Sequence, residues 1–575
     1  MKKSIPVPAA AKKAKKKADL EPLKLVALGG LGEIGMNLMV LECGDDLIVI
    51  DCGVLFPDLY WMGLDLVLPD FSYLVQNKDR IRALFVTHGH EDHIGAIPFL
   101  LKEVKIPIIY CSRFAARLIT EKCIEHGVQK DLLIHHVQAG DTVPAGAFEV
   151  EFIHVTHSTL ETFALSIETP HGLVVHSGDF KFDEKPYDGP PSDKKRFAAL
   201  AKRKPLLLLS DSTNSERSGH SASETSISRE LKKLIKEAEA AVVVALFASN
   251  IHRVHQLMDI AEEFGRKVFL SGRSMERYVH IAIEENFLPA KLSLLYPIEE
   301  LERFPRDEVL VLSTGSQGES RSSLLRLAKD ENRWLKIRSK DVIILSSRNI
   351  PGNERAISYV VNQLYRLGAT VHYEDMHNVH VSGHAYQGEQ EELIKLVKPQ
   401  YFIPIHGEYR HMTVHSQTAK NMGRTMGTSL KTFVLENGMV WQYSRDGEVS
   451  TVDVVPTGRR WTFAGFSGTL DDASIKERKT SARAGVVVVD CLVRNRGTNL
   501  VRTPSATLRG FLCSDDKVVE IKEEIEKNAE SAFENFFESN PEGLTREQAV
   551  GGAARKTVRK HLDLKPLVIV NFLTV

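Results

Sequence analysis

Four side chains of the types that bind metal ions lie within six positions of this chain. The segment VTHGHEDH places His88, His90, Asp92 and His93 directly after the apolar run ALFVT. Imidazole and carboxylate groups together suit Zn²⁺ or Mn²⁺, and such a site can keep a position open for water. A polar loop that holds histidine by chance is the simpler explanation, but three histidines and one aspartate in six residues argue against it. The segment predicts a metal-dependent hydrolase.

Three further apolar runs end in the same residue types. FIHVTHS ends in His157, LVVHSGDF contains Asp179 and FIPIHGEYRH contains His406. Each of them alone indicates little, because a single polar residue after a strand is more often part of a turn. Four strand ends that meet at one edge of a sheet would complete a two-metal site, and the order of these residues along the chain favours that interpretation.

We therefore predict two divalent metal ions. The assigned ligands are His88, His90 and His157 for one ion, Asp92, His93 and His406 for the other, and Asp179 as the bridge. Two ions about 3.5–4 Å apart can clamp the attacking and leaving oxygens of a phosphodiester. Metal-bound water can have its pKa lowered to about 7, so no Ser or Cys nucleophile is required. Asp51, at the end of LIVID, is expected to orient a ligand histidine or the hydroxide.

The elements that must position these residues are expected to be alternating strands and helices. KLVAL, NLMVLEC and LIVIDCG are predicted to be the first strands. AVVVALFAS, KVFLSG, EVLVLSTG and DVIILSS, separated by helices, are typical of a parallel sheet covered on both faces. Residues 224–238 are expected to form an amphipathic helix with Ser221 and Glu224 as a capping box. Ligand-rich stretches return near 371–415, so the parallel sheet is predicted to be an inserted domain.

At 575 residues the chain is too long for a single core. The predicted parts are a disordered basic tail (1–20), the first part of the metal-bearing domain (21–212), the inserted domain (213–370), the second part (371–448), a linker (449–469) and a C-terminal α/β domain (470–575). The tail holds seven lysines, which suit RNA or acidic partners, although a solvated tail without a dedicated role explains them equally well.

The composition narrows the class of protein and its setting. A hydrophobic content of 43% and a charged content of 26% are those of an ordinary globular protein. The net charge of −1 gives no overall attraction to nucleic acid, so a polyanionic substrate needs a local basic groove. Six scattered cysteines indicate a reducing compartment rather than a disulfide framework. No apolar run approaches the ~18 residues of a membrane span, and no signal peptide is recognisable. The expected location is the cytoplasm.

The order of the motifs resembles a known superfamily. HGHEDH followed by His157 and Asp179, with Asp51 at an earlier strand end, is similar to the metallo-β-lactamase pattern. The inserted domain with SDSTN (Asp211), VSGHA (His384) and PIHGE (His406) resembles the β-CASP branch, which acts on nucleic acids. GGLGEIGMN, DCGVLFPD, THGHEDHIGA, SGDFK, TGSQGE, HVSGHA and PIHGEYRH together resemble the bacterial ribonuclease J family over about residues 22–450. The lysine-rich tail is not part of the shared pattern.

The resemblance implies a fold and an activity. The fold is expected to be a metallo-β-lactamase αββα sandwich with an inserted β-CASP α/β domain and a small C-terminal α/β domain. The implied activity is 5′→3′ exonucleolytic cleavage of single-stranded RNA, with preference for a 5′-monophosphate, together with endonuclease activity, in RNA maturation and decay. DNA-acting relatives are expected to have an apolar residue at the position of His406, so this histidine favours RNA.

The resemblance also assigns roles to individual residues. Its metal ligands fall on the seven residues already assigned, with Zn²⁺ expected first and Mn²⁺ as the alternative. Ser382 and His384 are implied to contact the scissile phosphate, where hydrogen-bond donors stabilise charge on the nonbridging oxygens. Asp51, Asp92 and His384 are the predicted catalytic residues. A homo-oligomer, either dimer or tetramer, assembled partly through the C-terminal domain is also implied, as is association with RNA-degradation machinery.

The loop TGSQGE supplies three more candidate substrate-binding residues, Gly315, Ser316 and Gln317. Backbone N–H groups here could form a nest for a 5′-phosphate or the RNA backbone. A plain tight turn explains these residues nearly as well.

Two other functions stay open: a hydrolase with the same metal site that acts on a small molecule such as a thioester or lactam, and a metal-bearing RNA-binding scaffold. The long insert argues against a small-molecule substrate, because it would cover the metals and leave a groove that fits a polymer.

Overall fold

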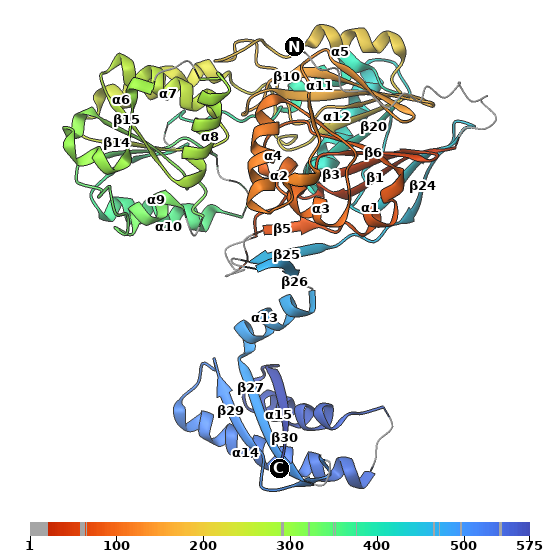
Figure 1. The fold of residues 1–575 in the computed structure, drawn as a ribbon, viewed down its shortest axis with the longest axis vertical. Helices are drawn as coiled ribbons and strands as arrows, with labels where there is room; N and C mark the ends of the chain where they lie inside the picture. Colours follow the sequence, from red (N-terminus) through yellow and green to blue (C-terminus); the bar gives the residue numbers. More distant parts are fainter. Residues whose placement is uncertain are drawn as a thin grey trace. The chain divides into compact units, whose positions relative to one another are not determined.

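The protein is seen here as a computed structural model, which divides into two compact units, residues 1–466 and 467–575 (Figure 1). The structure describes residues 21–57, 64, 66–288, 292–319, 322–348, 350, 352–374, 377–463, 466–470, 472–494, 497–539 and 543–575. The predicted disordered tail over 1–20 lies outside the described residues.

Two β-sheets packed face to face form the centre of the first unit. One sheet has the strand order β24 (Val449–Val454), β23 (Met439–Tyr443), β1 (Leu23–Gly29), β3 (Leu38–Cys43), β4 (Asp46–Ile50), β6 (Ile81–Phe85), β7 (Ile109–Cys111) and β8 (Ile134–His136). The other has the order β22 (Lys431–Thr432), β20 (Tyr401–Ile405), β13 (Leu207–Asp211), β12 (Gly172–His176), β11 (Thr162–Thr169), β10 (Phe148–Val155) and β9 (Thr142–Ala145). Strands from beyond residue 400 therefore complete both sheets.

Helices cover the outer faces of the two sheets, so central strands such as β3 and β13 bury side chains on both sides. Between the sheets lie apolar residues such as Leu25, Phe85 and Leu165, and the rings of Phe85 and Phe152 are 6.0 Å apart. The first sheet packs against α1 (Ser72–Gln76), α3 (Ile97–Glu103) and α4 (Arg113–Glu125), and the second against α5 (Lys194–Leu200), α11 (Gln387–Val397) and α12 (Tyr409–Thr425). This αββα arrangement confirms the predicted fold class.

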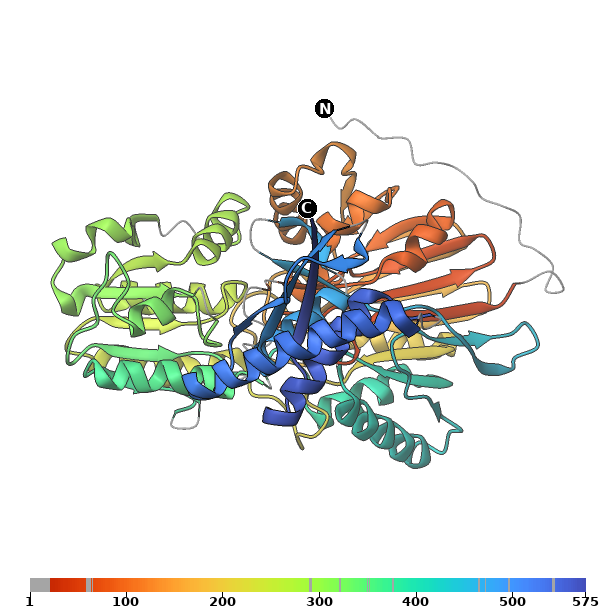
Figure 2. The same ribbon diagram turned by 90° about the horizontal axis from the view of Figure 1, so that it is seen from below.

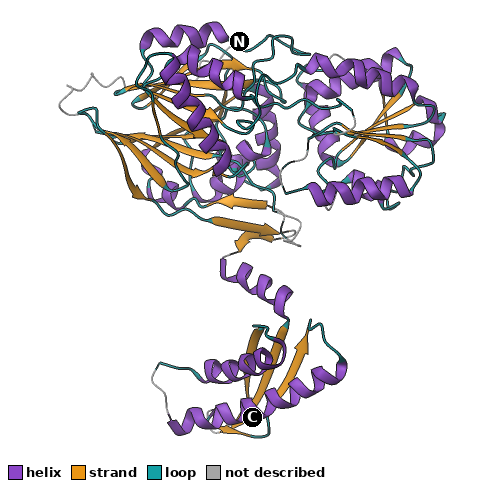
Figure 3. Cartoon of the chain, turned by 180° about the vertical axis from the view of Figure 1, so that it is seen from behind, coloured by secondary structure: helices purple, strands orange, loops and turns teal. Residues whose placement is uncertain are grey.

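The inserted domain is a six-stranded sheet in which all pairs are parallel. Its strand order is β16 (Leu295–Tyr296), β15 (Lys267–Ser271), β17 (Val309–Ser313), β14 (Val242–Ala245), β18 (Val342–Leu345) and β19 (Thr370–His372). One face carries α6 (Ser228–Glu237), α7 (Ile251–Glu263) and α8 (Arg273–Glu284), and the other α9 (Ser323–Ala328) and α10 (Glu354–Arg366), as Figure 3 shows from behind. Burial on both faces explains why VVVA in β14 is apolar throughout.

The insert meets the sandwich through packed helices and through buried charges. α8 packs on α4, with the rings of Phe114 and Tyr278 6.2 Å apart. Four buried charged residues, Lys181, Asp183, Glu224 and Arg253, form what we call the ion-pair cluster. Lys181 and Asp183 follow β12 of the sandwich, whereas Arg253 lies on α7 of the insert. The cluster therefore joins the two domains.

The capping box predicted at Ser221 and Glu224 is wrong. α6 begins after a short 3-10 turn, which Ser223 caps. The Glu224 carboxylate accepts instead from the Arg253 guanidinium at 2.6 Å. A buried guanidinium is a stronger partner for a carboxylate than a backbone N–H, so tertiary contact overrides the local motif.

The second unit is a small α/β domain. It contains α13 (Asp472–Ala484), β27 (Val486–Arg494), β28 (Asn499–Leu500), β29 (Ser505–Arg509), α14 (Asp515–Ser539), α15 (Arg546–Leu562) and β30 (Leu567–Thr574), with the long α14 visible in Figure 2. β27 is central, parallel to β30 and antiparallel to β28 and β29. Alternate residues of β27 are buried against α14 and α15. None of the helices that the structure describes, in either unit, is long and apolar enough to cross a membrane.

Candidate metal centre

The predicted metal ligands lie at one edge of the sandwich, just beyond the ends of four strands. β6 leads into the HGHEDH segment, β10 leads to His157, β12 to Asp179 and β20 to His406. The two sheets are joined at this edge by a hydrogen bond from Phe163 N to Thr87 O of 3.0 Å. The short strands β2 (Leu31–Gly32) and β21 (Gly407–Glu408) pair beside His406. Residues far apart in the sequence are therefore held by regular backbone.

Three histidine nitrogens face one another in the first group. His90 Nδ1 is 3.0 Å from His88 Nε2 and 3.2 Å from His157 Nε2. Asp179 Oδ2 completes the group, 3.7 Å from His88 Nε2 and 3.8 Å from His157 Nε2. All four donor atoms lie within 4.8 Å of one another.

The second group shares the same carboxylate oxygen. Asp179 Oδ2 lies 3.2 Å from His93 Nε2 and 3.4 Å from His406 Nε2. Asp92 Oδ2 is 3.6 Å from His93 Nε2 and 3.3 Å from His406 Nε2. The structure thus brings together all seven predicted ligands, in two groups that meet at Asp179.

The hydrogen bonds behind the first group determine which nitrogen carries a proton in two of its histidines, His88 and His157. Thr87 Oγ1 donates to Asp51 Oδ2 at 2.8 Å, because a carboxylate can only accept. The same hydroxyl oxygen must then accept from His88 Nδ1 at 3.0 Å, which leaves His88 Nε2 with a lone pair. His157 Nδ1 donates to the carbonyl of Gly383 at 2.7 Å, so its Nε2 also carries a lone pair.

The same logic applies to the second group. His93 Nδ1 donates to Asp51 Oδ2 at 2.8 Å. Thr213 Oγ1 donates to Asp211 Oδ1 at 2.7 Å and therefore accepts from His406 Nδ1 at 2.8 Å. Both histidines consequently turn Nε2 toward Asp92 and Asp179, and this nitrogen is the one that can exchange its proton for a metal ion. Carboxylates and hydroxyls behind a histidine commonly select its metal-binding tautomer in this way.

This donor set fits divalent metal ions. Nitrogen ligands of a tetrahedral shell, each about 2.0–2.1 Å from the metal, lie about 3.3 Å from one another. The nitrogen separations of 3.0 and 3.2 Å in the first group are close to that value. A cation at the centre of this group would be coordinated by Nε2 of His88 and His157 and by Nδ1 of His90.

Protonation in the cluster follows from burial and from the carboxylates. Burial, with His93 and other nearby histidines, lowers the pKa of His88 well below its ordinary value, and burial lowers the pKa of His90 to about 4. Burial also works against a charged His406, but Asp179 outweighs it and raises the pKa of His406 to about 9. Although burial disfavours the charged form of Asp179, the facing His406 and His93 hold its pKa well below the usual range. The second group thus attracts positive charge strongly.

Backbone conformation at the site is specialised. Asp51 and His406 have φ angles of 58° and 52°, in the left-handed region that costs a side-chain-bearing residue about 1–3 kcal/mol. A Cβ atom at Gly53 would lie 1.6 Å from the carbonyl oxygen of Asp92, and one at Gly383 would lie 2.8 Å from His157 Nδ1. Only glycine allows these two segments to approach the residues they support.

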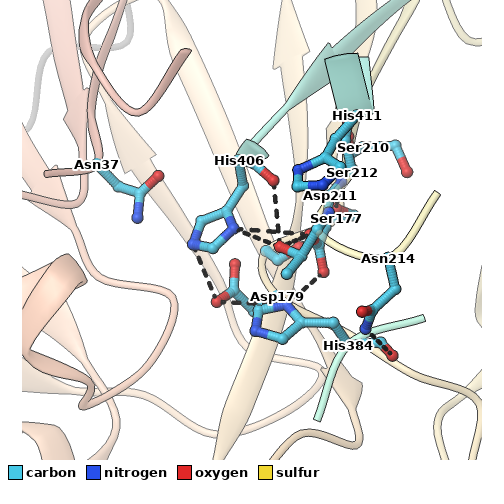
Figure 4. A network of polar contacts seen from close by, with 12 residues as sticks. Asn37, Ser177, Asp179, Ser210, Asp211, Ser212, Asn214, His384, His406 and His411 are labelled. Atoms are coloured by element: carbon cyan, nitrogen blue, oxygen red, sulfur yellow. Dashed lines mark hydrogen bonds and ion pairs between the residues drawn. The ribbon is translucent and has the colours of Figure 1, made fainter. Parts of the chain in front are cut away.

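His384 lies next to the metal cluster (Figure 4), and Ser382 lies beside it, with Oγ 3.1 Å from His384 N. His384 Nδ1 donates to Asp211 Oδ2 at 2.8 Å and lies 4.0 Å from Asp179 Oδ2. Its ring centroid is 4.8 Å from that of His157. One fifth of the His384 side chain is exposed, whereas Asp179 is buried. This histidine therefore stands between the cluster and the solvent, where a substrate would arrive.

Several supporting residues were not foreseen as site residues. Thr87, Thr213 and Asn214 each hold one of the predicted residues through a hydrogen bond. Asn37 Nδ2 donates to the backbone oxygen of Asp92 at 3.0 Å. Their positions in the sequence could have identified them, since Thr87 directly precedes His88, and Thr213 and Asn214 follow a buried strand.

The Gly315–Gln317 loop lies at the end of β17 in the insert, and no hydrogen bond among the described residues joins it to the metal cluster. The Gln317 side chain is buried and bonds to Ser347 Oγ at 3.1 Å and Arg348 O at 2.7 Å. Gln317 N donates to Glu319 Oε2 at 3.1 Å. This N–H is already satisfied, so the nest for a phosphate stays a prediction, and the Gln317 side chain serves to connect two loops.

Comparison with known families agrees with this geometry. Residues 47–190 match the beta-lactamase superfamily domain and 239–364 the ribonuclease J beta-CASP domain. Residues 368–432 match the Zn-dependent metallo-hydrolase RNA specificity domain and 473–575 the ribonuclease J C-terminal domain. Fold, cluster and matched domains together define a metal-dependent hydrolase that acts on RNA, as predicted. The small-molecule alternative does not fit an RNA specificity domain.

Relatives extend the match over most of the chain. Ribonuclease J of Helicobacter pylori is 38% identical over 544 residues, covering 94% of this chain and 78% of the relative. Ribonuclease J of Thermus thermophilus is 39% identical and covers 82% of both chains. Ribonuclease J2 of Bacillus subtilis is 32% identical over 96% of this chain and 99% of the relative. The chain belongs to the ribonuclease J family, which confirms the resemblance noted in the sequence.

Proposed function

We propose that this protein is a two-metal ribonuclease that degrades single-stranded RNA in the 5′→3′ direction from 5′-monophosphate ends and also cleaves internally. The observation that carries the proposal is the sharing of Asp179 Oδ2 between two donor groups, at 3.2–3.8 Å from four histidine nitrogens. A carboxylate between two such groups is suited to bridging two cations. Phosphodiester hydrolysis is the chemistry for which paired metal ions are particularly effective.

In this proposal one set of side chains binds the metal ions and another binds the phosphate. His88, His90 and His157 hold one ion, Asp92, His93 and His406 hold the other, and Asp179 bridges them. When bound, the ions supply a water of lowered pKa and neutralise charge on the phosphate. Asp51 orients His88, through Thr87, and His93. It touches neither substrate nor metal and is a positioning residue in the predicted catalytic set.

His384 and Ser382 are proposed to bind the scissile phosphate. Burial disfavours a charged His384, but the Asp211 carboxylate outweighs burial and raises the pKa of His384. With Nδ1 committed to Asp211, the protonated Nε2 is the atom available to donate to a phosphate oxygen. A preorganised donor of this kind is effective where negative charge increases in the transition state.

The direction of degradation and the preference for a 5′-monophosphate rest on family membership. Within the Gly315–Gln317 loop, Ser316 Oγ is buried and has no hydrogen-bond partner in the described part of the chain. We therefore propose that the Ser316 hydroxyl is the group of this loop that donates a hydrogen bond to a substrate oxygen. We propose Zn²⁺ as the resident metal, because imidazole nitrogens predominate among the donors, with Mn²⁺ as the alternative.

We further propose a homo-oligomer, dimer or tetramer, formed partly through the second unit. Helices α14 and α15 cover one face of its sheet, whereas Ile569, Leu573 and Val575 point to the other face and are 43%, 53% and 71% exposed. Exposed apolar side chains gathered on one face of a domain can mark an interface with another protein chain. The cytoplasm, with RNA-degradation machinery, is the setting that the family suggests.

The test uses single-stranded RNA and DNA of one sequence, labelled uniformly along the chain, with purified protein before and after chelation. The RNA carries a 5′-monophosphate, a 5′-triphosphate or a 5′-hydroxyl. We expect rapid release of labelled mononucleotide from the monophosphorylated RNA, slower release from the other ends, internal cuts in the triphosphorylated RNA, and no cleavage after chelation. Equal rates on all three ends would overturn the 5′ preference, and cleavage that survives full metal removal would overturn the two-metal proposal.

A further inference from the structure

One short turn reaches three different parts of the candidate site. It begins with Asp211, the last residue of β13, and continues through Thr213 and Asn214. Asp211 bonds to His384, Thr213 to His406, and Asn214 to Ser382. The first two bonds set the tautomers of histidines. The third has a different consequence, because it acts on a hydroxyl group.

The amide of Asn214 has a determined orientation. Its Nδ2 lies 2.8 Å from Ser382 Oγ and 3.2 Å from the carbonyl oxygen of His384. A carbonyl only accepts hydrogen bonds, so the atom that faces it must be the amide nitrogen and not the amide oxygen. Both hydrogens of the amide are thus donated, one of them to Ser382. Asn214 is buried, with 8% of its surface exposed, so solvent does not compete.

Ser382 Oγ receives a second donor from the backbone. His384 N donates to it at 3.1 Å. A hydroxyl group accepts two hydrogen bonds and donates one. With both acceptor positions filled by N–H groups, only the hydroxyl proton of Ser382 remains unused, and no acceptor for it is found among the described residues.

We propose that Asn214 is a positioning residue that makes Ser382 a committed donor to a phosphate oxygen. The inference rests on the proposed function, which sets the scissile phosphate against Ser382 and His384. A nonbridging phosphate oxygen can only accept, so it complements a hydroxyl whose proton has no other partner. In an ordinary serine the hydroxyl rotates between donating and accepting. Here two N–H groups remove that choice before the substrate binds.

Two substitutions of Asn214 separate this role from simple support. Asn214→Ala removes the donor, so the Ser382 hydroxyl can turn to accept from water, and we expect kcat to fall about 10-fold. Asn214→Asp keeps the size but offers only acceptor oxygens, which take the Ser382 proton, and we expect a loss of about 100-fold, the cost of a lost transition-state donor. KM should change less than threefold in Asn214→Ala.

A double-mutant cycle is the decisive experiment, with kcat measured on single-stranded RNA by the full-length, metal-loaded protein. If Asn214 acts through the hydroxyl, Asn214→Ala should have less than a twofold effect in a Ser382→Ala background. Asn528→Ala is the matched control, since Asn528 Nδ2 donates to Thr557 Oγ1 at 2.8 Å in the second unit. It should leave kcat unchanged. Metal content and melting temperature are recorded for every variant.

The outcomes separate this inference from the proposed function. If Ser382→Ala lowers kcat and Asn214→Ala lowers it by the same factor again in that background, Asn214 acts independently and the inference fails while the phosphate contact stands. If Ser382→Ala leaves kcat unchanged, the phosphate contact itself is wrong, and the inference falls with it. Wild-type kcat in Asn214→Asp would also overturn the inference.

Discussion

The metal cluster and the ion-pair cluster are both buried groups of polar side chains, but their charges are arranged in opposite ways. In the ion-pair cluster, Lys181 Nζ lies 3.3 Å from Asp183 and 3.7 Å from Glu224, and Arg253 lies 2.6 Å from Glu224. Each carboxylate there has a cationic side chain beside it. In the first group of the metal cluster, three histidine nitrogens face one another, and Asp179 is the carboxylate that shares their group.

The difference shows how a functional site can be told from a structural one. Burying charge is expensive unless the charge is paired, so a cluster whose charges cancel can remain in a folded core unaided. A cluster of metal-ligating groups that lacks such pairing is suited to taking up an outside cation. In the ion-pair cluster the opposite charges of the protein match one another, whereas the metal cluster gathers imidazole and carboxylate groups without a lysine or arginine among them. The following variants test whether the two clusters can be disturbed separately.

Removal of the shared carboxylate should have the largest effect. Asp179→Ala takes away the oxygen common to both donor groups, so we expect metal content to fall and kcat on RNA to drop at least about 1,000-fold, roughly 4 kcal/mol of transition-state stabilisation. RNA affinity should change little, because contacts to the phosphate backbone dominate it. Metal analysis, single-turnover cleavage and RNA binding are the measurements. Normal metal content with normal cleavage would refute the assignment of Asp179.

The ion-pair cluster should respond in stability and not in metal binding. Arg253→Met leaves the buried Glu224 carboxylate short of a partner, and removal of one member of such a pair costs about 3–5 kcal/mol. Denaturant unfolding measures the loss, and metal content per folded molecule is the companion measurement. A variant that unfolds normally but fails to bind metal would show that the two clusters are not separable.

Acid should weaken the ion-pair cluster through Glu224. Burial works to raise the pKa of Glu224, but Arg253 and Lys181 lower it to about 2. Since the unfolded value is about 4.3, the ionised form stabilises the fold above that pH, and this stability is lost as pH falls from about 4.3 through 2. The contribution is about 3 kcal/mol.

Glu224→Gln should therefore show a shallower dependence of unfolding free energy on pH between 5 and 2 than the unsubstituted protein. Denaturant titrations at successive pH values supply the comparison. An identical slope in the two proteins would mean that Glu224 does not titrate in this interval.

The smallest effect is expected where only a tautomer is disturbed. Thr213→Val removes the hydroxyl that accepts from His406 Nδ1, and loss of such a partner weakens metal affinity about 10–100-fold. Thr213→Ser keeps the hydroxyl and serves as the control. Metal competition with a chelator of known affinity measures the change. Equal affinities in the two variants would show that His406 needs no such partner.

The predicted ligands were accessible from the sequence because their signal is local. A strand pattern followed by histidine or aspartate can be read within about ten residues, and sheet edges then gather such ends. The partners that orient the ligands are not local. Asn214 and Ser382 are separated by 168 positions, and Asp51 and His93 by 42. Which polar residue meets which depends on the packing of two sheets, and no periodicity encodes that.

Tertiary contact also explains why the predicted capping box is wrong. Glu224 stands where a capping-box residue would, yet its carboxylate bonds to Arg253, on the next helix but one. There a local motif predicted a local partner, and a buried distant group provided a better one. The Gln317 side chain is likewise held by a distant group, since it is buried against Ser347.

The return of the chain to the sandwich after the insert determines when the metal centre can form during synthesis. Six of the seven assigned ligands have been made by Asp179, but His406 follows only after the whole insert, 227 positions later (406 − 179). At about 5–20 residues per second a ribosome needs roughly 10–45 s to cover that distance. Throughout this interval β1 of the nascent chain also lacks its neighbour β23. The second group of metal ligands is therefore completed only late in the synthesis of the chain.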